Sequence, residues 1–240
     1  HYLAATEYGG DKGIFGYGTT GSRVSMTNLV SNAGVVATDV TGVGSVRNGL
    51  AACKYGGDKG IFGYGLVDGV GTGADVSMTN LVSNVGVVAT DTTGVGTGRY
   101  NLAACEYGTD TAIFGYGYSG GDLGMTNLVT NAGVVGTDVT GVGTAREALA
   151  ACSYGTDKGI FGYGHIVSMT NLVTNAGVVG TDVTGVGTAR EALAACSYGT
   201  DKGIFGYGHI VSMTNLVTNA GVVGTDVTGV GTAREALAAC

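Results

Sequence analysis

The chain has 240 residues, of which 48 are glycine and none is proline or tryptophan. Hydrophobic residues make up 44% and charged residues 12%, which excludes the disordered class of low hydrophobicity and high charge. The net charge is −7 without any basic run, so we expect no nucleic-acid partner. No apolar stretch approaches the roughly 18 residues of a membrane-spanning helix, so we expect no membrane partner either.

Internal repetition dominates the chain. The segment Leu-Ala-Ala recurs at intervals, beginning at Leu3, Leu50, Leu102, Leu149, Leu193 and Leu237. These starts divide one repeat domain, 1–240, into units 3–49, 50–101, 102–148, 149–192 and 193–236, with 237–240 beginning a sixth first strand. The fourth and fifth units are identical in every residue, which indicates recent duplication or design.

The fourth unit shows the predicted elements in chain order. Four segments of strand-like composition, separated by turn residues, are expected at 149–154, 159–163, 169–173 and 177–184. The segment 189–195 is helical by propensity but spans less than two turns, and its counterparts in the first two units are poor helix formers. We therefore predict a loop that leads into the next strand.

Four short strands in about 44 residues is the size of one β-propeller blade. The sequence thus predicts an all-β fold, a β-propeller of four-stranded blades with five repeats, with a β-solenoid as the alternative. All length variation falls in one connection, between the second and third strands, at residues 19–25, 66–77, 118–124, 165–168 and 209–212. A solenoid tolerates insertions at many corners, so this confinement favours the propeller.

The order of motifs within each unit carries a family resemblance. Ala-Arg precedes Leu-Ala-Ala, then Ile-Phe-Gly-Tyr-Gly, the variable loop and Met-Thr-Asn-Leu-Val. This order resembles kelch repeats of galactose-oxidase-type propellers over essentially the whole chain, with 63–65 at the place of the kelch glycine pair. The kelch Tyr and Trp of the later strands are missing, and 177–179 stands where a Trp is expected. The chain is also similar to repetitive kelch-like phage and environmental proteins, which implies a tail-fibre or attachment role at a virion or extracellular surface.

The sixth first strand raises the question of ring closure. A closed ring of five blades needs only one of the segments 3–6 and 237–240 at its seam. Three outcomes remain open: the spare strand swaps in, it frays, or the chain belongs to a longer array. Self-association through the spare strand, giving a ring of several chains, is a further alternative.

One cysteine follows each later Leu-Ala-Ala segment, at Cys53, Cys105, Cys152, Cys196 and Cys240. The spacing matches no zinc motif, so these residues are expected to be small buried hydrophobes on the innermost strand. A sulfur-lined tunnel or disulfides between blades are the functional alternatives.

The sequence offers few residues for acid–base catalysis or for metal binding. His165 and His209 are copies of one loop position, so one unit cannot assemble a catalytic triad or metal cluster from them. The recurrent aspartates, such as Asp157 and Asp182, are expected to cap turns rather than bind calcium. The sequence therefore predicts no enzyme activity, no metal and no cofactor.

An arginine precedes each innermost strand, at Arg47, Arg99, Arg146, Arg190 and Arg234. In a four-stranded blade this position shares a face with the variable loops, where guanidinium groups could hold carboxylates or sugars. The alternative is a structural clamp in which each arginine pairs with a neighbouring blade's aspartate. The constant tyrosines of Gly-Tyr-Gly are expected to pack between blades.

The functional prediction is a non-enzymatic recognition module that binds carbohydrate or a surface protein through its variable loops. The candidate ligand-binding residues are the five arginines together with Arg23, Asp68, Asp75, Tyr118, Asp122, His165 and His209. The alternative is a structural repeat array or assembly subunit without a ligand, either a natural spacer or a designed propeller. Two identical units with four-residue loops favour this alternative, because a selected site rarely tolerates copies.

Overall fold

The protein is all-β in the computed structural model, which describes residues 1–68, 73–165 and 167–240. Residues 69–72 and 166, in the second and fourth variable loops, lie outside this description. No helix of the described chain is long and apolar enough to cross a membrane.

The strands recur in the same order in each unit. The first strands are β1 (Ala4–Tyr8), β5 (Ala51–Tyr55), β10 (Ala103–Tyr107), β13 (Ala150–Tyr154) and β16 (Ala194–Tyr198). The second strands are β2 (Lys12–Gly16), β6 (Lys59–Gly63), β11 (Thr111–Gly115), β14 (Lys158–Gly162) and β17 (Lys202–Gly206). The third strands are β3 (Thr27–Val30), β9 (Thr79–Val82), β12 (Thr126–Val129), β15 (Thr170–Val173) and β18 (Thr214–Val217).

Each unit folds into a three-stranded antiparallel sheet of consecutive hairpins. In the fourth unit Cys152 lies opposite Ile160, which lies opposite Leu172 on the third strand. The first hairpin turns sharply because Gly155 and Thr156 take left-handed backbone angles, with φ of 61° and 72°. The first three expected strands are confirmed, and segment 189–195 forms no helix.

The expected fourth strand is present only as isolated bridges. In the fourth unit Val179 bridges Val173, and Val183 bridges Thr170. Between these bridges, the Asn171 side chain donates to the Gly180 carbonyl over 3.1 Å, so a side chain replaces part of the backbone ladder. The outer edge of each sheet is therefore an irregular segment, rich in glycine, rather than a regular strand.

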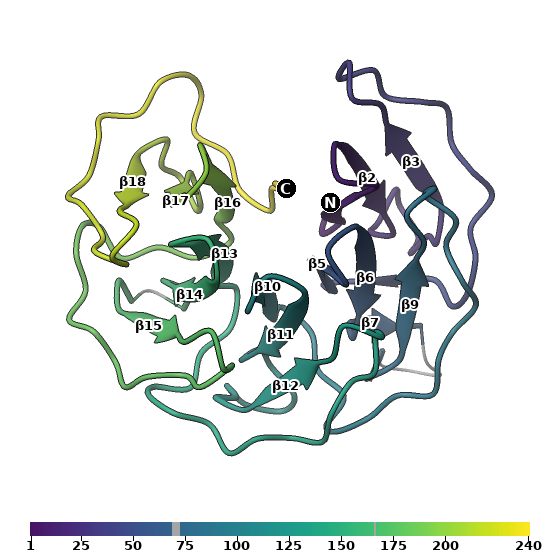
Figure 1. The fold of residues 1–240 in the computed structure, drawn as a ribbon, viewed down its shortest axis with the longest axis horizontal. Coiled ribbons are helices and arrows are strands. Elements are labelled where there is room, and N and C mark those ends of the chain that lie inside the picture. Colours follow the sequence, from purple (N-terminus) through teal and green to yellow (C-terminus); the bar gives the residue numbers. More distant parts are fainter. Residues whose placement is uncertain (69–72, 166) are drawn as a thin grey trace.

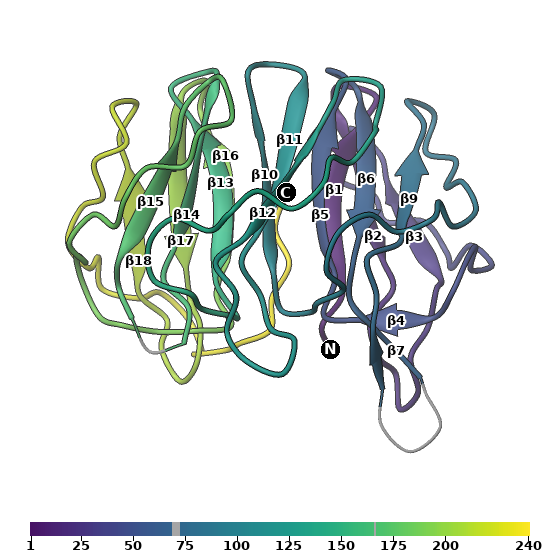
Figure 2. The ribbon, with the colours of Figure 1, turned by 90° about the horizontal axis from the view of Figure 1, so that it is seen from below.

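The five sheets stand around a common axis (Figure 1). Their innermost strands are β1, β5, β10, β13 and β16, and the first hairpins and the variable loops lie on opposite faces (Figure 2). The ring is open between the first and fifth sheets, and both chain ends lie at this opening (Figure 1). A closed ring of five sheets, one of the outcomes considered above, is not formed.

A small additional sheet marks the loop face. It consists of β4 (Arg47–Asn48), β7 (Leu66–Val67) and β8 (Ala74–Asp75), with β7 in the centre. Strand β4 immediately precedes the second unit's first strand, and β7 and β8 belong to the longest variable loop. This pairing places the variable loop and the arginine position on the same side of the ring, as the sequence predicted.

The hydrophobic core lies between neighbouring sheets. Tyr64 packs against Phe114 of the next unit with ring centroids 5.1 Å apart, and both side chains are fully buried. The same pair recurs at Tyr17–Phe62, Tyr116–Phe161 and Tyr163–Phe205. These repeated aromatic contacts confirm that the tyrosines pack between units, as predicted.

The cysteines are free and differ in exposure around the ring. Cys53, Cys105 and Cys152 are buried, Cys196 is half-buried and Cys240 is exposed. The expectation of small buried hydrophobes is thus confirmed for the three central units, and the alternative of disulfides between units is not realised.

We expect this difference in exposure to produce a difference in the reactivity of the thiols. Burial raises the pKa of the Cys53, Cys105 and Cys152 thiols, so little thiolate is available to react. Native alkylation followed by mass spectrometry should label Cys240 first and the three buried thiols only after unfolding. Equal labelling of all five cysteines in the native protein would show that Cys53, Cys105 and Cys152 are not buried in solution.

Candidate functional site

The recurrent arginines lie inside the interfaces between units. Arg47, Arg99, Arg146 and Arg190 are at most 3% exposed, whereas Arg234, in the last unit, is exposed. Arg99 stacks on the Tyr64 ring at 4.3 Å and donates to Asn127 Oδ1 of the next unit over 2.8 Å. The four buried guanidinium groups have almost no surface to offer a ligand, and Arg47, Arg99 and Arg190 pair with the next unit's aspartate, as in the structural clamp.

The aspartate of the next unit completes this clamp. Arg99 Nη1 lies 4.0 Å from Asp138 Oδ1, and Asp138 also accepts hydrogen bonds from Asn127 and Thr97. Burial acts to raise the pKa of Asp138, but the hydrogen bonds from Asn127 and Thr97 and the charge of Arg99 together lower it. Burial raises the pKa of Tyr64 to about 12, so the stacked ring stays neutral.

The variable loops contact one another across unit boundaries. Arg23 of the first loop forms an ion pair with Asp68 of the second loop and donates to Asn48 Oδ1 over 3.0 Å. Asp75 lies on β8, where its backbone pairs with Leu66. The loops therefore form a connected surface.

An aromatic pair stands on the same face. Tyr118, which begins the third loop, exchanges two backbone hydrogen bonds with Tyr100, and their ring centroids lie 5.6 Å apart. Both side chains are half-buried. Partly exposed tyrosine rings combine an apolar surface with a polar edge, which suits them to ligand contact.

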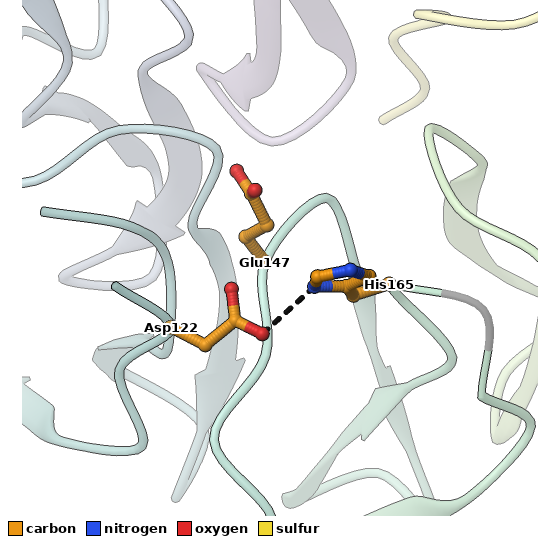
Figure 3. A group of neighbouring side chains, drawn as sticks. All are labelled: Asp122, Glu147 and His165. Carbon is orange, nitrogen blue, oxygen red and sulfur yellow. Dashed lines mark hydrogen bonds and ion pairs between the residues drawn. The ribbon is translucent and has the colours of Figure 1, made fainter. Parts of the chain in front are cut away.

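The third and fourth loops meet in a cluster of Asp122, Glu147 and His165 (Figure 3). His165 Nδ1 lies 2.8 Å from Asp122 Oδ2, and its backbone N–H donates to the Glu147 carbonyl over 3.0 Å. One ligand atom from each side chain lies within 4.8 Å of the others, so this group could hold a metal ion. Glu147 also has a hydrogen-bond partner within the protein, because its Oε2 accepts a hydrogen bond from Asn101 over 2.9 Å.

The Asp122 carboxylate controls the protonation of His165. Its hydrogen bond and negative charge raise the pKa of His165 above the ordinary histidine value. The pair therefore stabilises this loop contact below the ordinary histidine pKa, and the stabilisation is lost as the pH rises through the raised value.

We expect Asp122→Asn to lower the pKa of His165, since the variant removes the charge and keeps the shape. Two-dimensional NMR titration of the imidazole signals measures this shift directly. Asp110→Asn, on the opposite face, is the control that should leave the His165 titration unchanged. An unaltered pKa in the Asp122 variant would show that the two loops do not meet in solution.

A funnel opens at the centre of the loop face. It encloses a volume of about 350 Å³ and is lined by Glu147, Glu191, Glu235, His209 and Tyr2 above the apolar side chains of the inner strands. His209 Nδ1 lies 2.6 Å from Glu235 Oε2. Glu147 belongs to both the funnel and the cluster with Asp122 and His165, so the two form one continuous acidic site.

A second pocket lies among the ends of the inner strands at the face of the first hairpins. Lys54 Nζ lies 3.2 Å from Glu106 Oε2 and 3.5 Å from Glu7 Oε2, and the rest of the lining is mostly alanines, cysteines and small polar residues, with Asp201 and Lys202 among them. Burial raises the pKa of Glu106 despite the nearby lysine. Here lysines and carboxylates lie together, whereas the described lining of the loop-face funnel holds three glutamates and no lysine or arginine.

The structure thus brings together part of the predicted site. Tyr118, Asp122, His165 and His209 lie on the loop face, whereas four of the five arginines are withdrawn into interfaces. Sequence reasoning missed Glu147, Glu191 and Glu235, although each directly follows a recurrent arginine and therefore adjoins the axis.

No protein-family model and no curated protein matches the chain.

Proposed function

We propose that the chain is a kelch-like β-propeller in which the irregular edge segment serves as the fourth strand of each blade. Three antiparallel strands and an edge segment with two bridges recur in every unit, which supports a four-stranded blade. The radial placement of the sheets around an axis also supports it (Figure 1). Consecutive antiparallel hairpins are not the parallel coils typical of a solenoid.

The proposed function is a non-enzymatic binding module whose ligand meets the loop face. The observation that carries this proposal is the convergence of all the length variation, the acidic funnel and the Asp122–Glu147–His165 cluster on one face. The remaining scaffold repeats the same packing contacts from unit to unit. Variable loops on a rigid repetitive scaffold are the usual arrangement of a recognition surface.

The chemistry of the funnel narrows the ligand class. Glu147, Glu191 and Glu235 offer acceptors for hydroxyl and ammonium groups, and Tyr2 is 49% exposed beside them. A net charge of −7 disfavours an anionic ligand at the same site. Neutral or amino-bearing carbohydrate, displayed on a cell surface or on a surface protein, fits this arrangement better than an acidic glycan.

Attachment at a virion or extracellular surface remains the proposed setting. The alternative, a structural array without a ligand, is favoured by the fourth and fifth units, which are identical and carry four-residue loops. Binding measurements distinguish the two proposals.

A glycan array tests the binding proposal. The variant replaces residues 118–124 by the four-residue sequence of 165–168, which removes Tyr118 and Asp122 but keeps a loop that the scaffold already accepts. We expect the full-length protein to bind neutral or amino sugars and the variant to lose that binding. Asp110→Asn, on the hairpin face, should bind as the original chain does. Absence of binding to every glycan and to surface proteins, with both proteins folded, would favour the structural array.

A further inference from the structure

The tail Leu237–Cys240 occupies a sixth position around the axis. A Cβ placed on Gly159 would lie 2.6 Å from Cys105 Sγ of the preceding unit, and one on Gly203 would lie 2.6 Å from Cys152 Sγ. A Cβ on Gly13, in the first unit, would lie 3.5 Å from Cys240 Sγ. The tail therefore stands before the first unit as each inner strand stands before the next.

A chain of backbone hydrogen bonds orders the same positions. The residues before each Leu-Ala-Ala segment all have left-handed φ angles, from 52° to 62°: Tyr2, Gly49, Asn101, Ala148, Ala192 and Ala236. From Gly49 onward, the N–H of each of these residues donates to the carbonyl of the residue named before it. The first of these hydrogen bonds, from Gly49 to Tyr2, is 3.2 Å long, and the last, from Ala236 to Ala192, is 2.9 Å long. The ring thus has six equivalent places at its axis and five complete sheets around them.

The trailing side of the fifth unit presents half of an interface. Tyr207 is half-buried and still carries Arg234 stacked on its ring at 4.2 Å, whereas Tyr64, Tyr116 and Tyr163 are fully buried. Arg234 itself is exposed, and Tyr198 is 38% exposed. These side chains are oriented as in the four formed interfaces but remain uncovered.

The leading side of the first unit presents the other half. Phe15 and Asn28 are half-buried, whereas their counterparts Phe62, Phe114, Phe161 and Phe205, and Asn80, Asn127, Asn171 and Asn215, are completely buried. Gly34 has no atom within 4 Å of an added Cβ among the described residues, but Gly86 and its later counterparts each meet a tyrosine of the preceding unit. The two open sides therefore carry complementary halves of one repeated contact.

We propose that the opening is a docking site for one further unit of this same repeat, for which Leu237–Cys240 supplies the first strand. The occupant would place a phenylalanine on Tyr207 and an asparagine and an aspartate on Arg234. On its other side it would place a tyrosine and an arginine against Phe15 and Asn28. A second copy would bring five sheets, whereas the six places at the axis leave a single place without a complete sheet. This proposal does not depend on the ligand proposed for the loop face.

The test attaches one more unit covalently. The sequence of residues 197–234 is fused after Cys240 in one protein and before His1 in another, since the same opening adjoins both ends (Figure 1). We expect both fusions to be monomers that melt roughly 10 °C or more above the original chain. Native alkylation of Cys240 should become about tenfold slower or more in both, because the new strands cover it.

Variants separate docking from mere addition of a folded segment. Phe15→Ala should lower the melting temperature by several times more in each fusion than in the original chain, because the half-buried Phe15 becomes completely buried only after docking. A fusion with unchanged melting temperature, unchanged Cys240 labelling and no added cost for Phe15→Ala would overturn the proposal. A stable dimer of the original chain with protected Cys240 would also overturn it and identify a second copy as the occupant.

Discussion

Arg190→Ala is expected to lower the free energy of unfolding by about 3–4 kcal/mol. The guanidinium is 3% exposed, stacks on the Tyr163 ring at 4.2 Å and donates to Asn215 Oδ1 over 2.6 Å. Its loss leaves a cavity against Tyr163 and deprives the fully buried Asn215 of a donor. Urea denaturation monitored by tyrosine fluorescence and circular dichroism measures the change.

Arg234→Ala is the matched control, because the fourth and fifth units have the same sequence. Arg234 also stacks on a tyrosine, Tyr207, but it is exposed at the open side of the ring. Its removal should cost less than about 1 kcal/mol. Equal effects of the two substitutions would show that the arginines act within their own unit rather than as clamps between units.

Gly162→Ala is expected to destabilise the protein by about 2–3 kcal/mol through overpacking. An added Cβ would lie 2.6 Å from Cζ of Phe205, which is fully buried in the next unit. The phenylalanine ring cannot retreat without separating the two sheets, because it also packs on Tyr163 with centroids 5.2 Å apart. Thermal unfolding followed by circular dichroism should show a clear drop in melting temperature.

Gly206→Ala provides the same substitution in the same local sequence without the neighbour. The nearest atom to its added Cβ is Thr214 Cγ2 at 3.5 Å, an ordinary packing distance. Alanine is favoured over glycine in a strand, so this variant should be neutral or slightly stabilising. A comparable loss of stability in both variants would attribute the effect to the strand itself and contradict the interface.

These paired substitutions follow from the way a repeat protein distributes its stability. A single sheet with small side chains cannot bury its own faces, so the aromatic, arginine and asparagine contacts between units supply much of the packing. The end units then have fewer such contacts than the central ones. Cys105 in a central unit is buried and Cys240 at the end of the chain is exposed, as expected from this difference in the number of contacts.

Much of the fold was predictable from local patterns. Three strands per unit follow from alternation and β-branched residues bounded by glycine turns, and the variable loop follows from unit length alone. The fourth strand was overestimated, because the bridged segment 177–184 contains two glycines and part of its ladder is replaced by the Asn171 side chain. Composition indicates β-structure there but does not reveal how the backbone groups are satisfied.

The repeat, the all-β class and the face on which the variable loops lie can all be predicted from the sequence alone. The burial of four arginines, the meeting of Asp122 and His165 with Glu147, and the six places at the axis become visible only in the folded structure. The physical reason is that each of these features depends on the neighbouring unit. Arg190 and Arg234 have identical sequence surroundings, yet one is sealed by the next sheet and the other faces the opening.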